Sequence, residues 1–536
     1  MVDLLGELCL TATIIAPLPG VIISIPRRGA TSSRHQIVAG FAWLAAGLAV
    51  ITATTVAITG PFTVALLNSK HQLAVGLMAN QFTVALLVLI CVVGALVQSF
   101  SVRYLSPDRA AHRFFAAANM VIVSMAIVST SATAAVLIAA WITAGIAFVG
   151  VVGYRSDLPE VRASARRTLK MFMLGDLALV ATLAILLVRV GNVDLVSPSS
   201  LEATSARLGS LTTVVAFLIV VAALTRSAQG PLGRWLPGTV SAPTPVSALL
   251  HAGLVNGGGI LLIRLSILSA SSTLPMILVF TIAGMTATFG AALMTRKPDV
   301  KGALAYSTIA QMGFMIAECA VGAYLAALVH LIGHAMYKAT LFFGSGSQIP
   351  RVGQAPMAPT NTLSKLAKIA LTTVTAAATV TVMIEIPGVI NHRGGIFLLI
   401  FTTATVVIAA WSWWDRRPAA RGLTLLLILA LLGAGALYGL VLGTLESWIA
   451  PALPALGPGV LSPWLLLALA GVSLAMSGAL RLPRIQRMIT ATLVSISAPP
   501  VWVSKTTEPR KRRPCPVDSP TRHTLKVAGP WKEEIA

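Results

Sequence analysis

Residues 326–346 read AALVHLIGHAMYKATLFFGSG and place three ionisable side chains inside one apolar helix. His330, His334 and Lys338 follow one another at intervals of four residues, so they share one helix face. A charged side chain at the centre of a bilayer costs roughly 2.5–3.5 kcal/mol even on the gentlest insertion scales. We therefore expect this face to contact protein or trapped water and to belong to a path for ions or protons.

The whole chain has the composition of a membrane protein. Of its 536 residues, 56% are hydrophobic and 10% are charged, which excludes an ordinary soluble domain. The apolar segments are too long, and alternate too little, for a β-barrel, so we predict an all-α polytopic membrane protein. A net charge of +22 would suggest nucleic acid binding in a soluble protein, but here the basic residues cluster between spans and set the topology.

About 15 stretches approach the length of about 20 apolar residues that one crossing requires. The predicted spans are residues 4–25, 36–60, 76–100, 114–131, 133–153, 168–190, 211–236, 245–266, 274–294, 302–320, 322–345, 366–390, 395–414, 422–444 and 460–480. Every second loop is rich in arginine and lysine. The loops on the other side of the membrane contain few such residues, mainly Lys70, Arg207 and Arg393. This alternation predicts a multi-pass protein of the cell inner membrane, with its N-terminus outside and its C-terminus in the cytoplasm.

The C-terminal part of the sequence changes character. Residues 489–503 are apolar but contain Pro499 and Pro500, so we expect an interfacial segment there instead of a crossing. Residues 504–536 are polar and basic, which predicts a disordered cytoplasmic tail that contacts anionic lipid or a partner, and not nucleic acid. The four cysteines show neither metal-ligand spacing nor a disulfide framework, and no cleavable signal pattern precedes the first apolar run.

Two predicted spans contain helix-breaking motifs. Span 211–236 contains the sequence TRSAQGP at residues 225–231, and span 366–390 contains Glu385-Ile-Pro-Gly388. Broken helices at membrane depth line cavities in transporters, whereas the simpler alternative is a kink or the start of a loop. Gly257, Gly258 and Gly259 lie in an apolar span, so we expect close helix packing there and not a nucleotide site.

Further ionisable residues lie within or near the spans: Asp176, Arg226, His251, Arg264, Lys301 and Glu318. Histidine titrates near neutral pH and is the natural proton carrier among them. Simpler interpretations remain open. Lys301 would be an inner-leaflet anchor, and His251 would hydrogen-bond to a neighbouring helix. Glu318 and Arg264 would be snorkelling residues at span ends. The sequence contains no nucleophile elbow, phosphate loop, catalytic carboxylate pair or zinc-ligand spacing, so we predict no catalytic site and no cofactor or metal in this chain.

Three long motifs resemble those of the proton-conducting antiporter-like membrane subunits. They are RSAQGPLGRWLPGTVSAPTPVSALLHAG at residues 226–253, DVKGALAYSTIAQMGFM at 299–315, and the helix quoted first. Tyr104-Leu105 and His112-Arg-Phe-Phe115 also match. The family includes the L subunit of respiratory complex I, the A subunit of multi-subunit cation/proton antiporters, and the membrane subunit DabB of an inorganic-carbon accumulation complex. The resemblance covers roughly residues 75–350.

The resemblance implies two inverted five-helix repeats, each with a broken helix. It divides the chain into N-terminal transmembrane helices (1–113), a first repeat (114–266), a second repeat (267–414), C-terminal helices with the interfacial segment (415–503) and the tail (504–536). It also implies a proton pathway formed by His251, Lys301, His330, His334 and Lys338. Asp176, Arg226, Glu318 and Glu385 would act on that pathway as electrostatic modulators.

The chain departs from the family pattern mainly in its first half. Ile142 follows Trp141 where the family has a glutamate, and Arg226 replaces a lysine. Because arginine effectively never deprotonates in proteins, Arg226 is no proton relay. The expected lysine is also missing near Pro387, where Glu385 and His392 are the nearest polar residues. This pattern, the sequence STIAQMGFM and a shorter C-terminal region without a long lateral helix resemble DabB more than the complex I subunit.

The resemblance to DabB implies an ion-conducting membrane subunit, for protons or sodium ions, of a complex that accumulates inorganic carbon. Its partner would be a soluble, zinc-dependent DabA-like protein that resembles β-carbonic anhydrase and hydrates CO2 to bicarbonate. Protons would enter from outside and pass along Lys338, His334, His330 and Lys301. One alternative is a pumping subunit of an NADH-quinone oxidoreductase or a multi-subunit cation/proton antiporter. Another is a non-conducting scaffold for a soluble enzyme, marked by Ile142 and Arg226.

Overall fold

A computed structural model describes residues 2–24, 32–69, 72–240, 242–297, 299–345, 364–385 and 421–453, with a few single positions between 399 and 414. The chain divides into two units, residues 1–478 and 479–536, and all described residues belong to the first. Most of the predicted span 395–414, the span 460–480, the interfacial segment and the tail lie outside the described residues. The side chain of Glu385 and all of His392 lie outside them as well.

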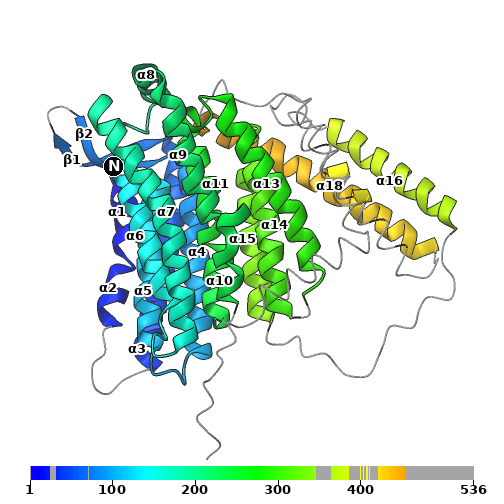
Figure 1. Cartoon of the computed structure of the whole chain (residues 1–536), viewed down its shortest axis with the longest axis horizontal. Coiled ribbons are helices and arrows are strands. Elements are labelled where there is room, and N and C mark those ends of the chain that lie inside the picture. The colour runs from blue at the N-terminus through cyan, green and yellow to red at the C-terminus, as the bar shows by residue number, and fades with distance from the viewer. Residues whose placement is uncertain are drawn as a thin grey trace, which may run out of the picture. The chain divides into compact units, whose positions relative to one another are not determined.

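Helices make up almost all of the described part (Figure 1). The α-helices are α1 (Val2–Ile15), α2 (Leu18–Ile23), α3 (Ser32–Thr59), α4 (Gln81–Tyr104), α5 (Ala111–Thr130), α6 (Ala134–Val152), α7 (Pro159–Arg189), α8 (Pro198–Leu208), α9 (Leu211–Arg226), α10 (Thr244–Ala252), α11 (Gly257–Arg264), α12 (Ser266–Ser269), α13 (Thr273–Met294), α14 (Val300–Ala320), α15 (Tyr324–Gly344), α16 (Lys365–Glu385) and α18 (Arg421–Ile449). Short 3-10 helices are η1 (Gly230–Trp235), η2 (Pro237–Thr239), η3 (Leu254–Asn256) and η5 (Ala450–Ala452).

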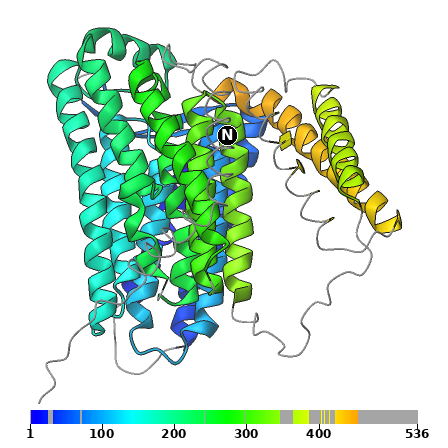
Figure 2. The ribbon, with the colours of Figure 1, turned by 45° about the vertical axis from the view of Figure 1, so that its right-hand side comes forward.

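Twelve helical segments in the described residues are long and apolar enough to cross a membrane. The predicted span 302–320 corresponds to α14, which has 21 residues but is more polar than these twelve. It still lies among them, because it packs against both α13 and α15. Figures 1 and 2 show the long helices between α3 and α15 gathered into one bundle of roughly parallel rods. The prediction of an all-α polytopic membrane protein is thus confirmed.

The prediction was wrong at the start of the third span, because residues 72–79 form a strand. Strands β1 (Phe62–Ser69) and β2 (Gln72–Ala79) pair antiparallel, with Phe62 opposite Ala79. Helix α4 begins only at Gln81, where the Asn80 side chain accepts a hydrogen bond from the Thr83 amide and the Thr83 hydroxyl accepts one from the Asn80 amide. Such reciprocal capping satisfies two otherwise free backbone donors and fixes the first turn. The apolar residues before Asn80 had extended the predicted helix too far.

The connection between α7 and α9 also differs from the prediction. Helix α7 begins at Pro159, nine residues before the predicted span, because a basic segment continues the helix beyond its apolar part. Helix α8, which the sequence reasoning missed, follows α7 and has 11 residues. Figure 1 shows α8 and the β1–β2 hairpin at the same end of the bundle. Both are short elements between crossings, where apolar length gives no signal.

Span 211–236 is a broken helix. Of the two interpretations of its TRSAQGP motif, a broken helix or a simple kink, the structure shows the first. Helix α9 ends at Arg226, Ala228 adopts a left-handed conformation with φ of 55°, and the chain continues as η1. Side chains replace the lost helical bonds. The Gln229 amide donates to the carbonyls of Ser227 (2.7 Å) and Ile309 (3.3 Å), and the Gly230 amide donates to the Thr286 hydroxyl (2.9 Å). Such substitution is what permits irregular backbone at membrane depth.

A second break, between α10 and α11, was not predicted. Helix α10 ends at Ala252, and η3 separates it from α11. The Asn256 amide donates to the Ala252 carbonyl (2.8 Å), and the Ser227 hydroxyl donates to the Val255 carbonyl (2.8 Å). The second of these bonds joins the two breaks directly, so the interruptions of α9 and of the α10–α11 helix lie side by side.

The glycine triplet at the start of α11 packs closely against neighbouring helices, as predicted. A Cβ atom on Gly258 would collide with the Ala223 carbonyl of α9, and one on Gly259 would lie 2.9 Å from the Met315 sulfur of α14. Small residues let transmembrane helices approach closely enough for dispersion contacts to hold them together. The triplet thereby fixes α11 against both α9 and α14.

Candidate functional site

The titratable face of α15 points into the protein. The exposed fraction is 4% for His334 and 0% for Lys338, whereas Met336 and Tyr337 on the other side are exposed by 40% and 55%. The His330 side chain is 17% exposed. The side chains at four-residue intervals therefore share a face that meets protein, as their spacing predicts.

Helix α14 supplies the partners for both ends of this face. The Lys338 ammonium donates to the Ser307 hydroxyl (2.7 Å) and to the Leu304 carbonyl (3.4 Å). At the other end, the His330 Nδ1 lies 3.0 Å from a Glu318 carboxylate oxygen. Glu318 is only 1% exposed, so its interpretation as a snorkelling residue was wrong. A carboxylate in the interior of the bundle is stabilised by a nearby group that can carry positive charge.

His334 lies between these two anchored ends. Its ring centroid is 6.3 Å from that of His330, and it is close enough to Lys338 and His251 to interact with them electrostatically. Neither ring nitrogen of His334 has a hydrogen-bond partner among the described residues, although both are buried. Since buried polar atoms are normally paired, these two nitrogens are unusual and mark the centre of the site.

His251 joins this cluster from α10. It is 1% exposed and stacks on Phe342 of α15, with ring centroids 4.6 Å apart and planes 13° from parallel. Its Nδ1 atom has no hydrogen-bond partner among the described residues. Ring stacking on Phe342 thus contributes to the position of His251, and its Nδ1 faces no hydrogen-bond partner in the described part.

Lys301 lies on the first turn of α14 and is partly buried. Its ammonium donates to the Ala242 carbonyl (2.9 Å), and it borders a cavity of about 540 Å³. The first turn is fixed by Asp299, whose carboxylate accepts the Gly302 amide (2.6 Å). Lys301 thus binds the protein itself and does not merely extend toward lipid headgroups.

Asp176 and Arg226 form a separate, closed arrangement in the first half of the chain. The Arg226 guanidinium donates to an Asp176 carboxylate oxygen at 2.9 Å and to the Trp141 carbonyl at 3.4 Å. It lies between the rings of Trp141 and Phe172, 4.4 Å from each centroid. Gly145 makes room for it, since a Cβ there would lie 2.9 Å from a guanidinium nitrogen. The cation is fixed by an ion pair and two aromatic faces.

Arg264 is also buried, so its interpretation as a snorkelling residue was wrong. It is 5% exposed, and its guanidinium donates to the Ser131 carbonyl and, at 3.2 Å, to the Ser131 hydroxyl. Those bonds tie the end of α11 to the α5–α6 connection. The structure gives this arginine a bracing role outside the pathway.

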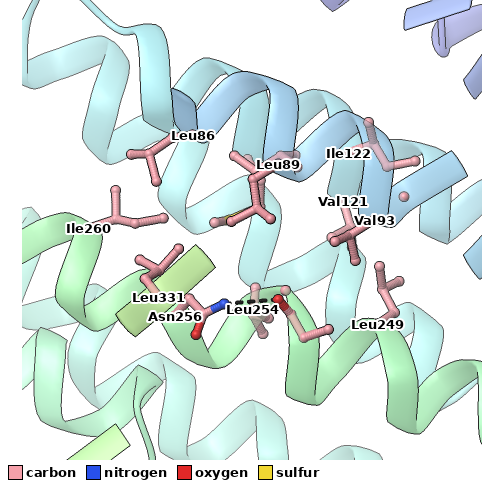
Figure 3. A pocket seen from close by; sticks show the side chains of 15 residues that line it. Leu86, Leu89, Val93, Val121, Ile122, Leu249, Leu254, Asn256, Ile260 and Leu331 are labelled. Carbon is pink, nitrogen blue, oxygen red and sulfur yellow. Dashed lines mark hydrogen bonds between the residues drawn. The ribbon is translucent and has the colours of Figure 1, made fainter. Parts of the chain in front are cut away.

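The small cavity beside the α10–α11 break has a different character (Figure 3). It has a volume of about 30 Å³ and is lined almost entirely by apolar side chains such as Leu86, Leu89 and Ile260. Asn256 is the polar side chain among its lining residues; its Nδ2 donates to the Ala252 carbonyl, and its Oδ1 has no partner among the described residues. The lining contains no titratable side chain, so this cavity does not extend the row of titratable groups.

Comparison with known proteins assigns the chain to a family. Residues 119–414 match the family model described as NADH:quinone oxidoreductase/Mrp antiporter, TM, and residues 67–115 match NADH-Ubiquinone oxidoreductase (complex I), chain 5 N-terminus. The first match spans more than half of the chain. This protein belongs to the NADH:quinone oxidoreductase/Mrp antiporter membrane family.

The relatives that match this chain are named for different functions. The chain is 34% identical over 275 residues to the probable inorganic carbon transporter subunit DabB1 of Halothiobacillus neapolitanus, over 51% of this chain and 49% of the relative. It is 35% identical over 298 residues to the chloroplastic NAD(P)H-quinone oxidoreductase subunit 5 of Poa pratensis, over 54% and 42%. It therefore spans about half the length of the curated relatives that it matches.

A solved antiporter complex has the same fold. The structure of the Mrp complex from Dietzia sp. DQ12-45-1b aligns with a TM-score of 0.59 and 25% identity, over 92% of this chain and 57% of that one. The family membership and this likeness agree with the resemblance that the motifs in residues 226–253 and 299–346 had indicated.

Sequence reasoning on this family member missed four contributors to the site. Ser307 and Phe342 hold Lys338 and His251, and Trp141 and Phe172 enclose Arg226. Ser307 is the first residue of the motif STIAQMGFM, but many other spans also contain hydroxyl side chains. Ser307 becomes part of the site only because α15 packs beside it and brings Lys338 within hydrogen-bond distance. The two aromatic residues come from different helices, so no local pattern could connect them with Arg226. The side chain of Glu385, which we had expected to modulate the pathway, lies outside the described residues.

Proposed function

We propose that this protein is a proton-conducting membrane subunit of an energy-coupled complex that accumulates inorganic carbon. The observation that supports it most is the buried row on α15, where His334 lies between His330 and Lys338 and neither of its ring nitrogens has a partner among the residues that the structure describes. A neutral imidazole with both nitrogens available accepts a proton on one side and releases one on the other. Fixed partners on α14 hold the flanking groups in place.

In the proposed pathway, protons enter from outside, pass along the α15 row from His330 through His334 to Lys338, reach Lys301 on α14 and leave at the inner face. This order reverses the one expected from the sequence, because Lys338 bonds to Leu304 and Ser307 near Lys301, whereas His330 lies beside Glu318 at the other end of α14. His251 contributes from α10, where it faces the same row. Glu318 holds His330 at one end of the row and offsets part of its positive charge when it is protonated. A membrane potential of 100 mV supplies about 2.3 kcal/mol for each charge that crosses, which is enough to bias a catalytic cycle in a partner.

The first repeat contributes no second proton route in this proposal. Arg226 carries a permanent charge, and the ion pair with Asp176 and the two aromatic faces hold it in one place. A proton approaching this point would meet a cation that does not deprotonate. The pair therefore acts as an electrostatic barrier, and conduction is confined to the half of the protein that contains α14 and α15.

The proposed partner is a soluble, zinc-dependent DabA-like subunit that hydrates CO2 to bicarbonate in the cytoplasm. In this proposal the zinc belongs to that partner. The likeness to a relative named as a probable inorganic carbon transporter subunit supports this assignment. We place the protein in the cell inner membrane and take its orientation from the loop charges. The N-terminus then lies outside, and the arginine-rich loops lie in the cytoplasm.

The deciding experiment measures potential-driven proton flux in vesicles that contain the complex. Lys338→Met keeps most of the side-chain volume and removes the titratable group, so flux should fall at least tenfold while the amount of protein in the membrane is unchanged. The matched control is Lys170→Met, because Lys170 is an exposed lysine on α7 away from the row. Full flux in the Lys338→Met variant would rule out the proposed pathway.

A second candidate has its own support. The 35% identity to a quinone-oxidoreductase subunit and the fold shared with the Mrp complex both favour a pumping subunit of a redox or antiporter complex. Purification of the native complex separates the two. A large soluble zinc protein that co-purifies supports carbon accumulation, whereas several small membrane subunits support the pump.

A further inference from the structure

The cavity beside Lys301 is large, has several polar groups in its lining and is distinct from the buried row on α15. Its volume is about 540 Å³, and it lies where the α4–α5 and α6–α7 connections meet the beginnings of α10 and α14. Its polar lining residues are Tyr104, Asp108, Tyr154, Arg155, Ser164 and Lys301. Tyr104 and Leu158, which also line it, are 46% and 43% exposed, so the cavity reaches the protein surface. A polar space of this size is filled by water.

The inner wall of this cavity lies close to the buried lysine of α15. Lys301 borders the cavity, and the Leu304 carbonyl and Ser307 hydroxyl that accept from Lys338 are on the same helix, three and six residues further on. At a rise of 1.5 Å per residue, these acceptors are about 4.5 and 9 Å along α14 from Lys301. Water in the cavity is therefore separated from the α15 row by no more than two turns of helix.

The charges around the cavity are arranged so that no carboxylate is left for a metal cation. Asp108 is the acidic residue of the lining, and it accepts hydrogen bonds from the Tyr154 hydroxyl (3.0 Å) and the Arg155 guanidinium (3.3 Å). Burial and the nearby Asp108 carboxylate raise the pKa of Tyr154, so its hydroxyl keeps the proton that it donates. Asp299, next to Lys301 in the chain, is occupied by the Gly302 amide.

The lining thus carries two cationic groups, Lys301 and Arg155, against one engaged carboxylate. A hydrated sodium ion requires oxygen ligands in place of its lost water, and the one carboxylate of the lining is already engaged. A proton needs no such ligands, because it passes between hydrogen-bonded waters and is exchanged on the Lys301 side chain. The same net charge favours the approach of anions over cations from the bulk.

We propose that this cavity is the aqueous mouth of the pathway, through which Lys301 exchanges protons, and not sodium ions, with the cytoplasm. The inference rests on the proposed function for its link to flux, but the existence of the mouth is tested separately from conduction. Ser164 is a suitable reporter, because it lines the cavity and is 4% exposed, and replacement of its hydroxyl by a thiol is nearly isosteric.

The experiment uses Ser164→Cys in the full complex, with Cys515 replaced by serine. The other three native cysteines are buried. Membrane-impermeant thiosulfonate reagents, one anionic and one cationic, are added to right-side-out and inside-out vesicles, and labelling is read as a mass shift on a gel. The matched control is Thr182→Cys, since Thr182 is fully buried within α7. Proton and ²²Na⁺ flux are measured on the same vesicles before and after labelling.

We expect Ser164→Cys to react at least tenfold faster than Thr182→Cys, only from the cytoplasmic face, and faster with the anionic reagent. Labelling should then reduce proton flux at least tenfold, with no sodium flux before or after. If Ser164→Cys is labelled no faster than the buried control Thr182→Cys, the cavity is not open to water and the proposed mouth is overturned. Labelling without any loss of an existing proton flux overturns its place in the pathway, and sodium flux overturns the ion assignment. If the unlabelled complex shows no flux at all, the proposed function fails, whereas the labelling rates still decide whether the aqueous mouth exists.

Discussion

The Asp176–Arg226 pair provides the sharpest test of the packing described for helices α7 and α9. Asp176→Asn keeps the shape of the side chain and removes its charge. The Arg226 side chain is 2% exposed and that of Asp176 is 15% exposed, so the arginine would remain buried without a counter-ion. Breaking a fully buried ion pair by removing one partner costs about 3–5 kcal/mol.

The expected loss here falls at or below the bottom of that range. The asparagine oxygen can still accept the hydrogen bond that Asp176 now accepts at 2.9 Å, and the rings of Trp141 and Phe172 stay in place on both sides of the cation. Only the charge attraction is lost, and Asp176 is partly exposed. We therefore expect a decrease of about 2–3 kcal/mol in the free energy of unfolding.

A thiol-reactive fluorophore measures this decrease in detergent, because Cys9, Cys91 and Cys319 are buried and become reactive as the protein unfolds. The unfolding temperature of Asp176→Asn should fall by a few degrees. The matched control is Asp157→Asn, the same chemical change in an exposed pair with Arg155 at 3.2 Å, and it should leave that temperature unchanged. The double variant Asp176→Leu with Arg226→Met should recover most of the loss, because it removes both charges together.

An unchanged unfolding temperature in Asp176→Asn would refute the reasoning, since it would mean that the buried cation needs no carboxylate. A double variant no more stable than Asp176→Asn alone would show that the arginine contributes chiefly through its shape and its contacts with Trp141 and Phe172.

Two further predictions concern helix packing and the α15 row. Gly258→Ala should destabilise the protein by about 1–3 kcal/mol, because the new methyl group would collide with the Ala223 carbonyl, and the same fluorophore assay measures it. Gly284→Ala is its control, since nothing lies within 4 Å of the added atom, and equal effects would contradict the packing argument. Glu318→Gln should reduce proton flux several-fold in the vesicle assay, because it removes the carboxylate that lies 3.0 Å from the His330 Nδ1 and anchors one end of the row; unchanged flux would exclude that role.

The sequence by itself determined the membrane architecture and the shared face of the α15 row. Apolar length predicts a crossing, and four-residue spacing places His330, His334 and Lys338 on one side of any helix, so both follow from local geometry. Close helix packing at the glycine triplet 257–259 was also predictable, because it follows from three small residues in an apolar span. The motif in residues 225–231 indicated a possible break, but a kink would have had the same sequence.

Only the tertiary structure decided which polar groups are buried and what they meet. Asp176 and Arg226 are 50 residues apart in the chain, and Glu318 and Arg264 near span ends were equally compatible with snorkelling to the interface. The break between α10 and α11 likewise depends on Ser227 of a neighbouring helix, which accommodates the irregular backbone. Hydropathy and helical period act over a few residues, whereas the partner of a buried charge is chosen by which helices pack together.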